Sequence, residues 1–434
     1  MKKTARNQPE TPLIRYGVVE DTVAGERSSE EGGPVAILVC HGMGQQVRYE
    51  TISAVGLSIL AAAHARGAAI DPVGVHLSKA EDDEFITRAE IKWSEKGGSV
   101  REVHIYEAYW APLTEGRVTY WDTVKFLLQG GWQGLWYSKA FRRATFQRWM
   151  FGGPQDLPIG RLTFIATLGM MLFVLLQIGL IGYVGLDVGH RVLAGIAHPV
   201  VAGYRAWLRL GVWLALIAEA LFARYFLIQY VGAVAAYISP YKDSKFDQLR
   251  HQIQKTGFDI GKAIYGFGPT RSSVPAYSKV VVDGHSLGSV LAYDTLNALI
   301  NLDNVSAAGA GRGVVQRTRA LITFGSPLDK TAFIFRTQSN HPKDQIREQL
   351  AASVQPLILS YKLFRPPAFE WVNIWSKRDI ISGELNYYDD PNRGATDRRP
   401  IENMIDPEAW VPVFAHTQYW KDKMLAEQLY RCVS

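Results

Sequence analysis

One serine of the sequence stands in a pattern that could make it a nucleophile. Gly284-His285-Ser286-Leu287-Gly288 matches G-x-S-x-G and follows the β-branched run Val280–Val282. The next residues, Ser289–Asp294, suit a helix. A buried strand, a tight turn and a helix form a nucleophile elbow, because the turn lifts the serine hydroxyl clear of the sheet. We therefore predict that Ser286 is a nucleophile. A Cβ on either glycine of the motif would collide with the neighbouring strand or helix.

A serine hydroxyl needs a neighbouring base, and the base needs a carboxylate to fix its tautomer and charge. In the arrangement that goes with this elbow, the acid and then the base follow the serine along the chain. Only two of the ten histidines, His341 and His416, follow Ser286. Because His341 precedes the strand expected to carry the acid, the order favours His416. We expect this residue, in V-P-V-F-A-H-T-Q-Y-W, to lie in a loop before the final helix.

The acid is expected just after a late strand. Asp379 follows the predicted strand Glu370–Trp375 by a few residues and is the preferred candidate. Asp329 follows the preceding strand and is the second choice. Asp389 and Asp390 are more distant candidates.

A developing oxyanion needs backbone N–H groups aimed at it. One is expected from Leu287, the residue after the nucleophile. The other is expected from Met43, in the turn His41-Gly42-Met43-Gly44 that follows the buried run Pro34–Cys40. The glycines Gly42 and Gly44 let the backbone approach a substrate closely.

The remaining periodicities predict an α/β sheet built from segments on both sides of a long insertion. Buried runs or alternation predict strands at Phe85–Trp93, Val103–Trp110 and Ala320–Phe324, with a short one at Leu13–Val19. Helical spacing predicts helices at Tyr49–Ala63, Phe246–Tyr265 and Gln345–Val354.

The insertion has the composition of membrane helices. Leu162–Leu186 contains no charged residue and exceeds the ~20 residues needed to cross a bilayer. Leu210–Ile238 is also apolar but contains Glu219 and Arg224. The first segment could instead be a buried core helix, and the second could lie in the membrane interface or pack on the first. We expect a membrane-embedded helical hairpin that returns the chain to its starting side.

The charge balance agrees with an anionic surface as partner. The formal net charge is +6, and a stretch rich in tryptophan and arginine, Trp121–Met150, precedes the uncharged segment. Because the two are adjacent, a lipid bilayer is a better partner than nucleic acid, and no nucleic-acid partner is predicted. Basic residues on both flanks of the insertion place the two flanking halves on the cytoplasmic side.

Other chemistries find little support. Two cysteines give no disulfide framework and no zinc-ligand spacing. The N-terminus has no apolar stretch typical of a secretory signal, and neither G-x-G-x-x-G after a strand nor a P-loop is present. The acidic cluster Asp389–Asp397 lacks the spacing of a calcium loop and is read as a polar turn. No metal and no cofactor are predicted.

Four motifs together resemble a known group. The chain contains G-H-S-L-G-S-V-L-A-Y-D, H-G-M-G-Q-Q, T-F-G-S-P-L and H-T-Q-Y-W. It resembles α/β-hydrolase lipases, in particular bacterial membrane hydrolases akin to DDHD-domain phospholipases and GPI-inositol deacylases, over residues 34–120 and 244–425. The resemblance implies a serine esterase acting on acyl chains, with Ser286 as nucleophile, Asp379 as acid and His416 as base. The Asp/His signature that names the DDHD group does not align.

We therefore expect an α/β-hydrolase fold with a mainly parallel sheet, interrupted by the hairpin. Residues 1–33 form a flexible tail, 34–125 the first half of the domain, 126–240 the insertion and 241–434 the second half. The expected function is a membrane-bound serine hydrolase that cleaves lipid or phospholipid acyl esters. The H-G-M-G turn also resembles that of palmitoyl-protein thioesterases, so acyl-protein thioesters are an alternative substrate. A catalytically inactive membrane scaffold with the same fold is a further alternative.

Overall fold

The computed structural model describes the two halves of the chain that flank the insertion. The described ranges are residues 18–20, 33–43, 46–79, 85–119, 244–267, 277–306, 311–331, 354–357, 369–379, 381–385, 401–411 and 415–434, with isolated residues between them. Apart from such isolated residues, both apolar segments of the expected hairpin lie outside these ranges. Within the described ranges, no helix is both long enough and apolar enough to cross a bilayer.

A mostly parallel sheet forms the centre of the described structure. Its ten strands follow the order β1-β4-β5-β6-β2-β7-β8-β9-β10, with β3 paired to β5. Strands β6, β2, β7, β8, β9 and β10 are all parallel, whereas β5 is antiparallel to β4 and β6. The strands are β1 (Val18–Glu20), β2 (Val35–Cys40), β3 (Ala69–Ile70), β4 (Gly74–Lys79), β5 (Phe85–Ser94), β6 (Val100–Ala108), β7 (Lys279–His285), β8 (Thr318–Phe324), β9 (Glu370–Trp375) and β10 (Glu402–Ile405).

The central strands form where the sequence runs apolar without alternation. All six residues of β2 are buried, and six of the seven in β7 are buried. Both faces of these strands are covered, which is why their side chains do not alternate between apolar and polar. The predicted strands at Pro34–Cys40, Val280–Val282, Ala320–Phe324 and Glu370–Trp375 are confirmed.

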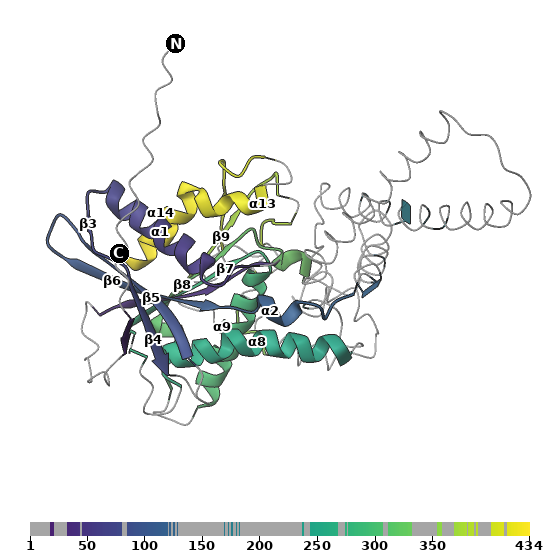
Figure 1. Ribbon diagram of the computed structural model, residues 1–434, viewed down its shortest axis with the longest axis horizontal. Helices are drawn as coiled ribbons and strands as arrows, with labels where there is room; N and C mark the ends of the chain where they lie inside the picture. The colour runs from purple at the N-terminus through teal and green to yellow at the C-terminus, as the bar shows by residue number, and fades with distance from the viewer. Residues whose placement is uncertain are drawn as a thin grey trace, which may run out of the picture.

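Helices cover both faces of the sheet and make three layers (Figure 1). On one face, α1 (Glu50–Ala65) and α14 (Lys423–Val433) bury Ile37 and Val281. On the other face, α8 (Ser244–Tyr265) and α9 (Leu287–Val305) bury Leu38 and Val282. Successive residues of one strand thus enter different cores. The described halves of the chain thus form a three-layer α/β architecture.

Besides the two-residue β3, two of the described strands were not predicted from the sequence. Strand β4 pairs with β5 in an antiparallel register, and the short β10 extends the sheet beyond β9. Neither shows a clear period, because β10 has four residues, none buried, and β4 faces a polar cluster described below. The predicted strand at Leu13–Val19 overlaps β1, which pairs with β4.

The topology creates a reversal point at β2. From β2 the chain builds β4, β5 and β6 on one side, and it then crosses to add β7 on the other side. In open parallel sheets, ligands bind outside the carboxyl ends of the strands where the winding direction reverses. Here those ends carry His41 after β2 and Ser286 after β7.

Candidate active site

Ser286 occupies a strained turn between β7 and α9. Its backbone has φ 54° and ψ −129°, and among the described non-glycine residues only Tyr49 shares a positive φ. Such a conformation costs about 1–3 kcal/mol and persists where the surrounding fold enforces it. The Ser286 N–H donates to the carbonyl oxygen of Phe324 at 3.0 Å, which ties the turn to β8.

The glycines of the motif are explained by close backbone contacts. A Cβ on Gly284 would lie 2.7 Å from the carbonyl oxygen of Gly288, in the first turn of α9. A Cβ on Gly288 would overlap the carbonyl oxygens of Cys40 and His41 at the end of β2. The helix therefore starts against the sheet at a distance that only glycine permits.

Three residues distant in sequence meet in one line of hydrogen bonds. His416 Nε2 lies 2.7 Å from Ser286 Oγ, and His416 Nδ1 lies 2.8 Å from Asp379 Oδ2. Because the Asp379 carboxylate can only accept, the proton of a neutral His416 sits on Nδ1. Nε2 is then free to accept the proton of the Ser286 hydroxyl. The structure thus brings together the three residues that the sequence order pointed to.

Asp379 is a buried carboxylate with donors on both oxygens. Besides His416, the Tyr419 hydroxyl donates to Oδ2 at 3.0 Å and the Ile381 N–H donates to Oδ1 at 2.8 Å. Burial raises the pKa of Asp379, but His416, Ile381 and Tyr419 together lower it to about 2. The group is therefore charged wherever His416 could act as a base.

His416 lies in α13 (Ala415–Gln418), a single helical turn where the sequence predicted a loop. Its backbone is held as well as its ring. The His285 Nε2–H donates to the carbonyl oxygen of His416 at 2.9 Å. Burial, followed by the nearby His416, lowers the pKa of His285 to about 3, so this histidine is neutral at physiological pH. The x position of G-x-S-x-G thus links the serine turn to the residue that faces it.

The two expected oxyanion donors lie at the correct edge of the sheet. Leu287 opens α9, so its N–H belongs to the unpaired first turn of a helix. A Cβ on Gly42 would lie 2.9 Å from Ser286 Cβ, which places the turn that carries Met43 against the serine. Among the described residues, no backbone partner is found for the N–H of Met43 or of Leu287. Gly44 lies outside the described residues.

Of the two acid candidates that the structure describes, Asp379 is the one at His416. Asp329 is half-buried after β8, next to Lys330, and it is Asp379 that lies within hydrogen-bond distance of the imidazole. His341, Asp389 and Asp390 lie outside the described residues.

Two supporting residues were not assigned from the sequence. Tyr419 was part of the H-T-Q-Y-W motif, and its position three residues after the base was the available signal. Lys330 gave no signal. Its ammonium donates to the carbonyl oxygens of Ile381 and Ser382 at 2.7 and 2.9 Å, and so holds the loop that follows Asp379. Burial lowers the pKa of Lys330 to about 8.

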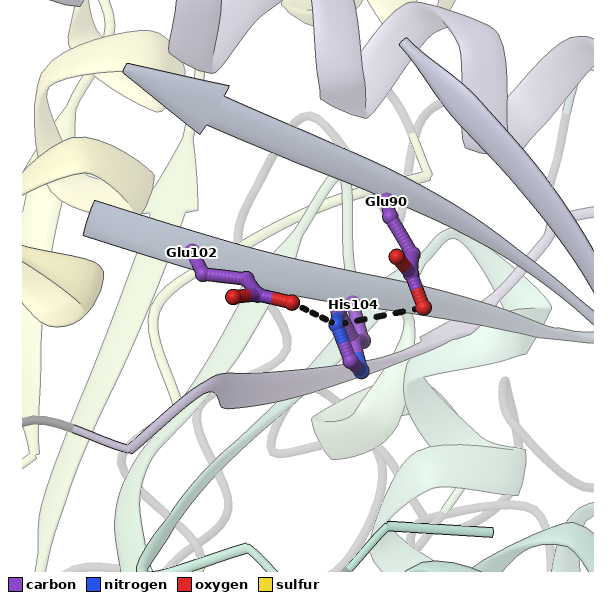
Figure 2. A group of neighbouring side chains, drawn as sticks. All are labelled: Glu90, Glu102 and His104. Carbon is purple, nitrogen blue, oxygen red and sulfur yellow. Dashed lines mark hydrogen bonds and ion pairs between the residues drawn. The ribbon is translucent and has the colours of Figure 1, made fainter. Parts of the chain in front are cut away.

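A second group of histidine and carboxylates lies on the antiparallel side of the sheet (Figure 2). His104 Nε2 lies 2.8 Å from Glu102 Oε1 and 3.3 Å from Glu90 Oε1. Among the described residues, these three are the set with metal-ligand geometry. Glu102 and His104 come from β6 and Glu90 from β5, and all three share one face of the sheet.

Two cations already compensate these carboxylates. Arg88 Nε donates to Glu90 Oε1 at 2.9 Å, and Lys92 Nζ lies 3.2 Å from Glu102 Oε1. A divalent ion would therefore enter a group whose two negative charges are matched by two positive ones. The hydrogen bond with His104 lowers the pKa of Glu102 to about 2 despite its burial. We assign this group, which we call the β5–β6 charge network, as an ion-pair network and not as a metal site.

Comparisons with known proteins leave the site to be interpreted from its own geometry. No protein-family model matches the chain, and searches of curated proteins and of solved structures find no match to it.

Proposed function

We propose that the protein is a serine hydrolase that cleaves carboxylic esters through an acyl-enzyme, on an α/β-hydrolase fold. The observation that carries this proposal is the hydrogen-bond line Ser286–His416–Asp379 at the carboxyl ends of the parallel strands. A base within hydrogen-bond reach of a hydroxyl, itself oriented by a buried carboxylate, is the arrangement that activates serine.

The chemistry follows from the proton positions. His416 Nε2 takes the hydroxyl proton as Ser286 Oγ attacks the ester carbonyl carbon. The N–H groups of Leu287 and Met43 stabilise the negative charge that develops on the carbonyl oxygen. The tetrahedral intermediate collapses when His416 gives the proton to the leaving alkoxide, and the acyl group remains on Ser286. Water then repeats the sequence and releases the acid. Asp379 keeps its charge throughout and stabilises the imidazolium.

Lipid or phospholipid acyl esters are the proposed substrates. Support comes from the sequence between the two halves of the domain. The uncharged segment Leu162–Leu186 is long enough to span a bilayer, and basic residues flank the insertion. A membrane anchor there would hold the hydrolase domain on the cytoplasmic face, next to acyl chains. Acyl-protein thioesters are the second candidate, because the same triad cleaves them. The alternative of an inactive scaffold predicts no turnover.

Covalent labelling tests the nucleophile directly. The detergent-solubilised full chain is treated with a fluorophosphonate probe, and the modified residue is identified by mass spectrometry. Wild type should be labelled at Ser286, and Ser286→Ala should not be labelled. Ser289→Ala is the matched control, because Ser289 lies in the same turn but donates its hydroxyl to the Gly284 carbonyl oxygen at 2.7 Å. Equal labelling of wild type and Ser286→Ala would sink the assignment.

A substrate panel separates the candidates. Wild type and Ser286→Ala are compared on a short-chain aryl ester, on phospholipid vesicles and on an S-acylated peptide. Release of fatty acid from vesicles in a Ser286-dependent way supports the lipid proposal. Turnover of the peptide thioester alone would favour the second candidate, and no turnover of any substrate would favour the scaffold.

A further inference from the structure

His41, the first residue after β2, is held between two backbone groups. It is fully buried. Its Nδ1 lies 2.8 Å from the carbonyl oxygen of Gly42, and its Nε2 lies 3.0 Å from the backbone nitrogen of Trp110. Both neighbours have a single possible role, because a carbonyl oxygen only accepts and an amide N–H only donates.

These two contacts settle the protonation of the ring. Nε2 accepts the Trp110 N–H and therefore carries no proton, so Nδ1 carries the one proton of the neutral imidazole and donates it to Gly42. Burial lowers the pKa of His41 to about 4, in spite of the hydrogen bond to Gly42, and the ring is neutral at physiological pH. A cationic ring would present a second N–H to the N–H of Trp110.

Trp110 fixes the orientation of the ring. The two aromatic systems stack with centroids 5.0 Å apart and planes inclined by 9°. The indole Nε1–H also donates to the carbonyl oxygen of His41 at 3.1 Å. The imidazole therefore has no freedom to turn away from Gly42, and its donor direction is set by the end of β6.

Holding the Gly42 carbonyl orients the next amide. The peptide between Gly42 and Met43 is planar and trans, because no cis peptide is found among the described residues. Its C=O and N–H consequently point in opposite directions. The C=O points to His41, so the Met43 N–H points away from it. Gly42 itself lies against Ser286, since a Cβ there would be 2.9 Å from Ser286 Cβ.

We propose that His41 is a positioning residue that aims the Met43 N–H at the oxyanion formed on attack by Ser286. This inference rests on the proposed hydrolase function. It assigns a role to a side chain that contacts neither the substrate nor Ser286. It also explains why a buried histidine directly follows β2. Without His41, the Gly42–Met43 peptide could rotate, and its N–H would have to be ordered during each turnover.

Three substitutions separate positioning from packing. His41→Asn keeps an amide donor near the Nδ1 position and so can still hold Gly42. His41→Gln keeps an acceptor near the Nε2 position and serves Trp110 instead. His41→Leu keeps volume and loses both contacts. If the Gly42 contact is what matters, the order of kcat is wild type, then His41→Asn, then His41→Gln and His41→Leu, with about a 10²-fold loss for the last.

The readouts are chosen so that general damage does not imitate the effect. For each variant, kcat and KM are measured on an aryl ester, together with the inhibition constant of an arylboronic acid, which forms a tetrahedral adduct on an activated serine. The expected result is a rise of the inhibition constant in proportion to the loss of kcat/KM, with KM little changed. Circular dichroism and thermal unfolding confirm that each variant is folded, and His64→Leu, on the exposed side of α1, serves as control.

Two failures are distinguishable. If wild type is not labelled by a fluorophosphonate and does not turn over esters, the hydrolase proposal fails and this inference falls with it. If wild type is labelled and active but folded His41→Leu matches it, or His41→Gln exceeds His41→Asn, only the positioning role is overturned.

Discussion

Two groups in this molecule combine histidine with carboxylates, and in each the histidine lies between a carboxylate and a hydroxyl. The Ser286–His416–Asp379 line lies where parallel strands end, on a turn with a positive φ. The β5–β6 charge network lies in the middle of antiparallel strands with regular backbone. The hydroxyl of the first group belongs to a serine, whereas His104 of the second faces the hydroxyl of Tyr277 at 2.7 Å and its two carboxylate partners are matched by Arg88 and Lys92.

The difference shows what turns such residues into a reactive site. In the network, Glu90 and Glu102 each form an ion pair with a cation, and these pairs stabilise the sheet. In the Ser286–His416–Asp379 line, the Asp379 carboxylate bonds one imidazole nitrogen and the other nitrogen faces a serine hydroxyl on a strained turn, whereas His104 faces the buried tyrosine hydroxyl of Tyr277. Strand ends also leave backbone N–H groups free, which strand interiors do not. Location in the topology therefore separates the two roles.

The largest expected effect comes from removing the charge of one carboxylate in each group and comparing the loss of kcat. Asp379→Asn should lower kcat by about 10⁴-fold, because an amide cannot fix the imidazole tautomer or stabilise its charge. The matched change in the network, Glu102→Gln, should leave kcat unchanged. Steady-state kinetics on an aryl ester measure both. A comparable loss in the two variants would mean that the network takes part in catalysis.

A substitution in the β5–β6 charge network should lower the stability of the fold and leave kcat unchanged. Glu90→Gln removes the carboxylate that lies 2.9 Å from the buried Arg88 guanidinium, which should lower the free energy of unfolding by about 3 kcal/mol. The folded fraction should keep its kcat. Urea denaturation checks this, with the exposed Glu115→Gln as control. An unchanged urea midpoint would show that the Arg88–Glu90 ion pair does not stabilise the fold.

A smaller loss of kcat is expected when Asp379 loses one of its hydrogen-bond donors. Tyr419→Phe removes one donor from Asp379 and one partner of Ser382, so kcat should fall by about 3- to 10-fold and stability by about 1 kcal/mol. Tyr430→Phe, on α14 and with its hydroxyl 3.4 Å from Glu95, is the control. Equal kcat in the two variants would remove Tyr419 from the site.

The smallest expected effect is on the pH dependence of stability, and it comes from a buried carboxyl that belongs to neither group. Asp283 on β7 is fully buried, and neither of its oxygens has a well-formed hydrogen bond to any residue that the structure describes. Burial raises its pKa well above the usual 3.8, so the folded state keeps a proton that the unfolded state releases. The free energy of unfolding should therefore fall as pH rises above about 4.

Asp283→Asn should remove that dependence. At about pH 4, the denaturation curves of wild type and variant should nearly coincide. At about pH 7, the variant should be the more stable of the two. Identical slopes of stability against pH would show that Asp283 is ionised in the fold. Activity should change little.

Much of the fold could be predicted from local patterns. Unbroken apolar runs located β2 and β7, mostly apolar segments located β8 and β9, and helical spacing located α1 and α8 within a few residues. These patterns are reliable because burial on both faces or on one face leaves a period in the sequence. Short or polar elements such as β10 leave none.

Within the candidate site, chain order and motif chemistry selected Ser286, His416 and Asp379 as candidates, and they identified the turns that carry Leu287 and Met43. Their catalytic roles stay predictions. Sequence alone could not exclude Asp329, because both acids follow strands of the same sheet. The membrane hairpin likewise stays a prediction from the uncharged run Leu162–Leu186.

The tertiary structure decided what depends on contacts between distant segments. Ser286 and His416 are 130 residues apart, and only the packing of α13 beside β7 brings them to 2.7 Å. The choice of Asp379, the support from Tyr419 and Lys330, and the tautomer of His41 all depend on single donors and acceptors brought together by folding. Residue type determined which chemistry was available. Direction and distance, set by the sheet, decided which groups could carry it out.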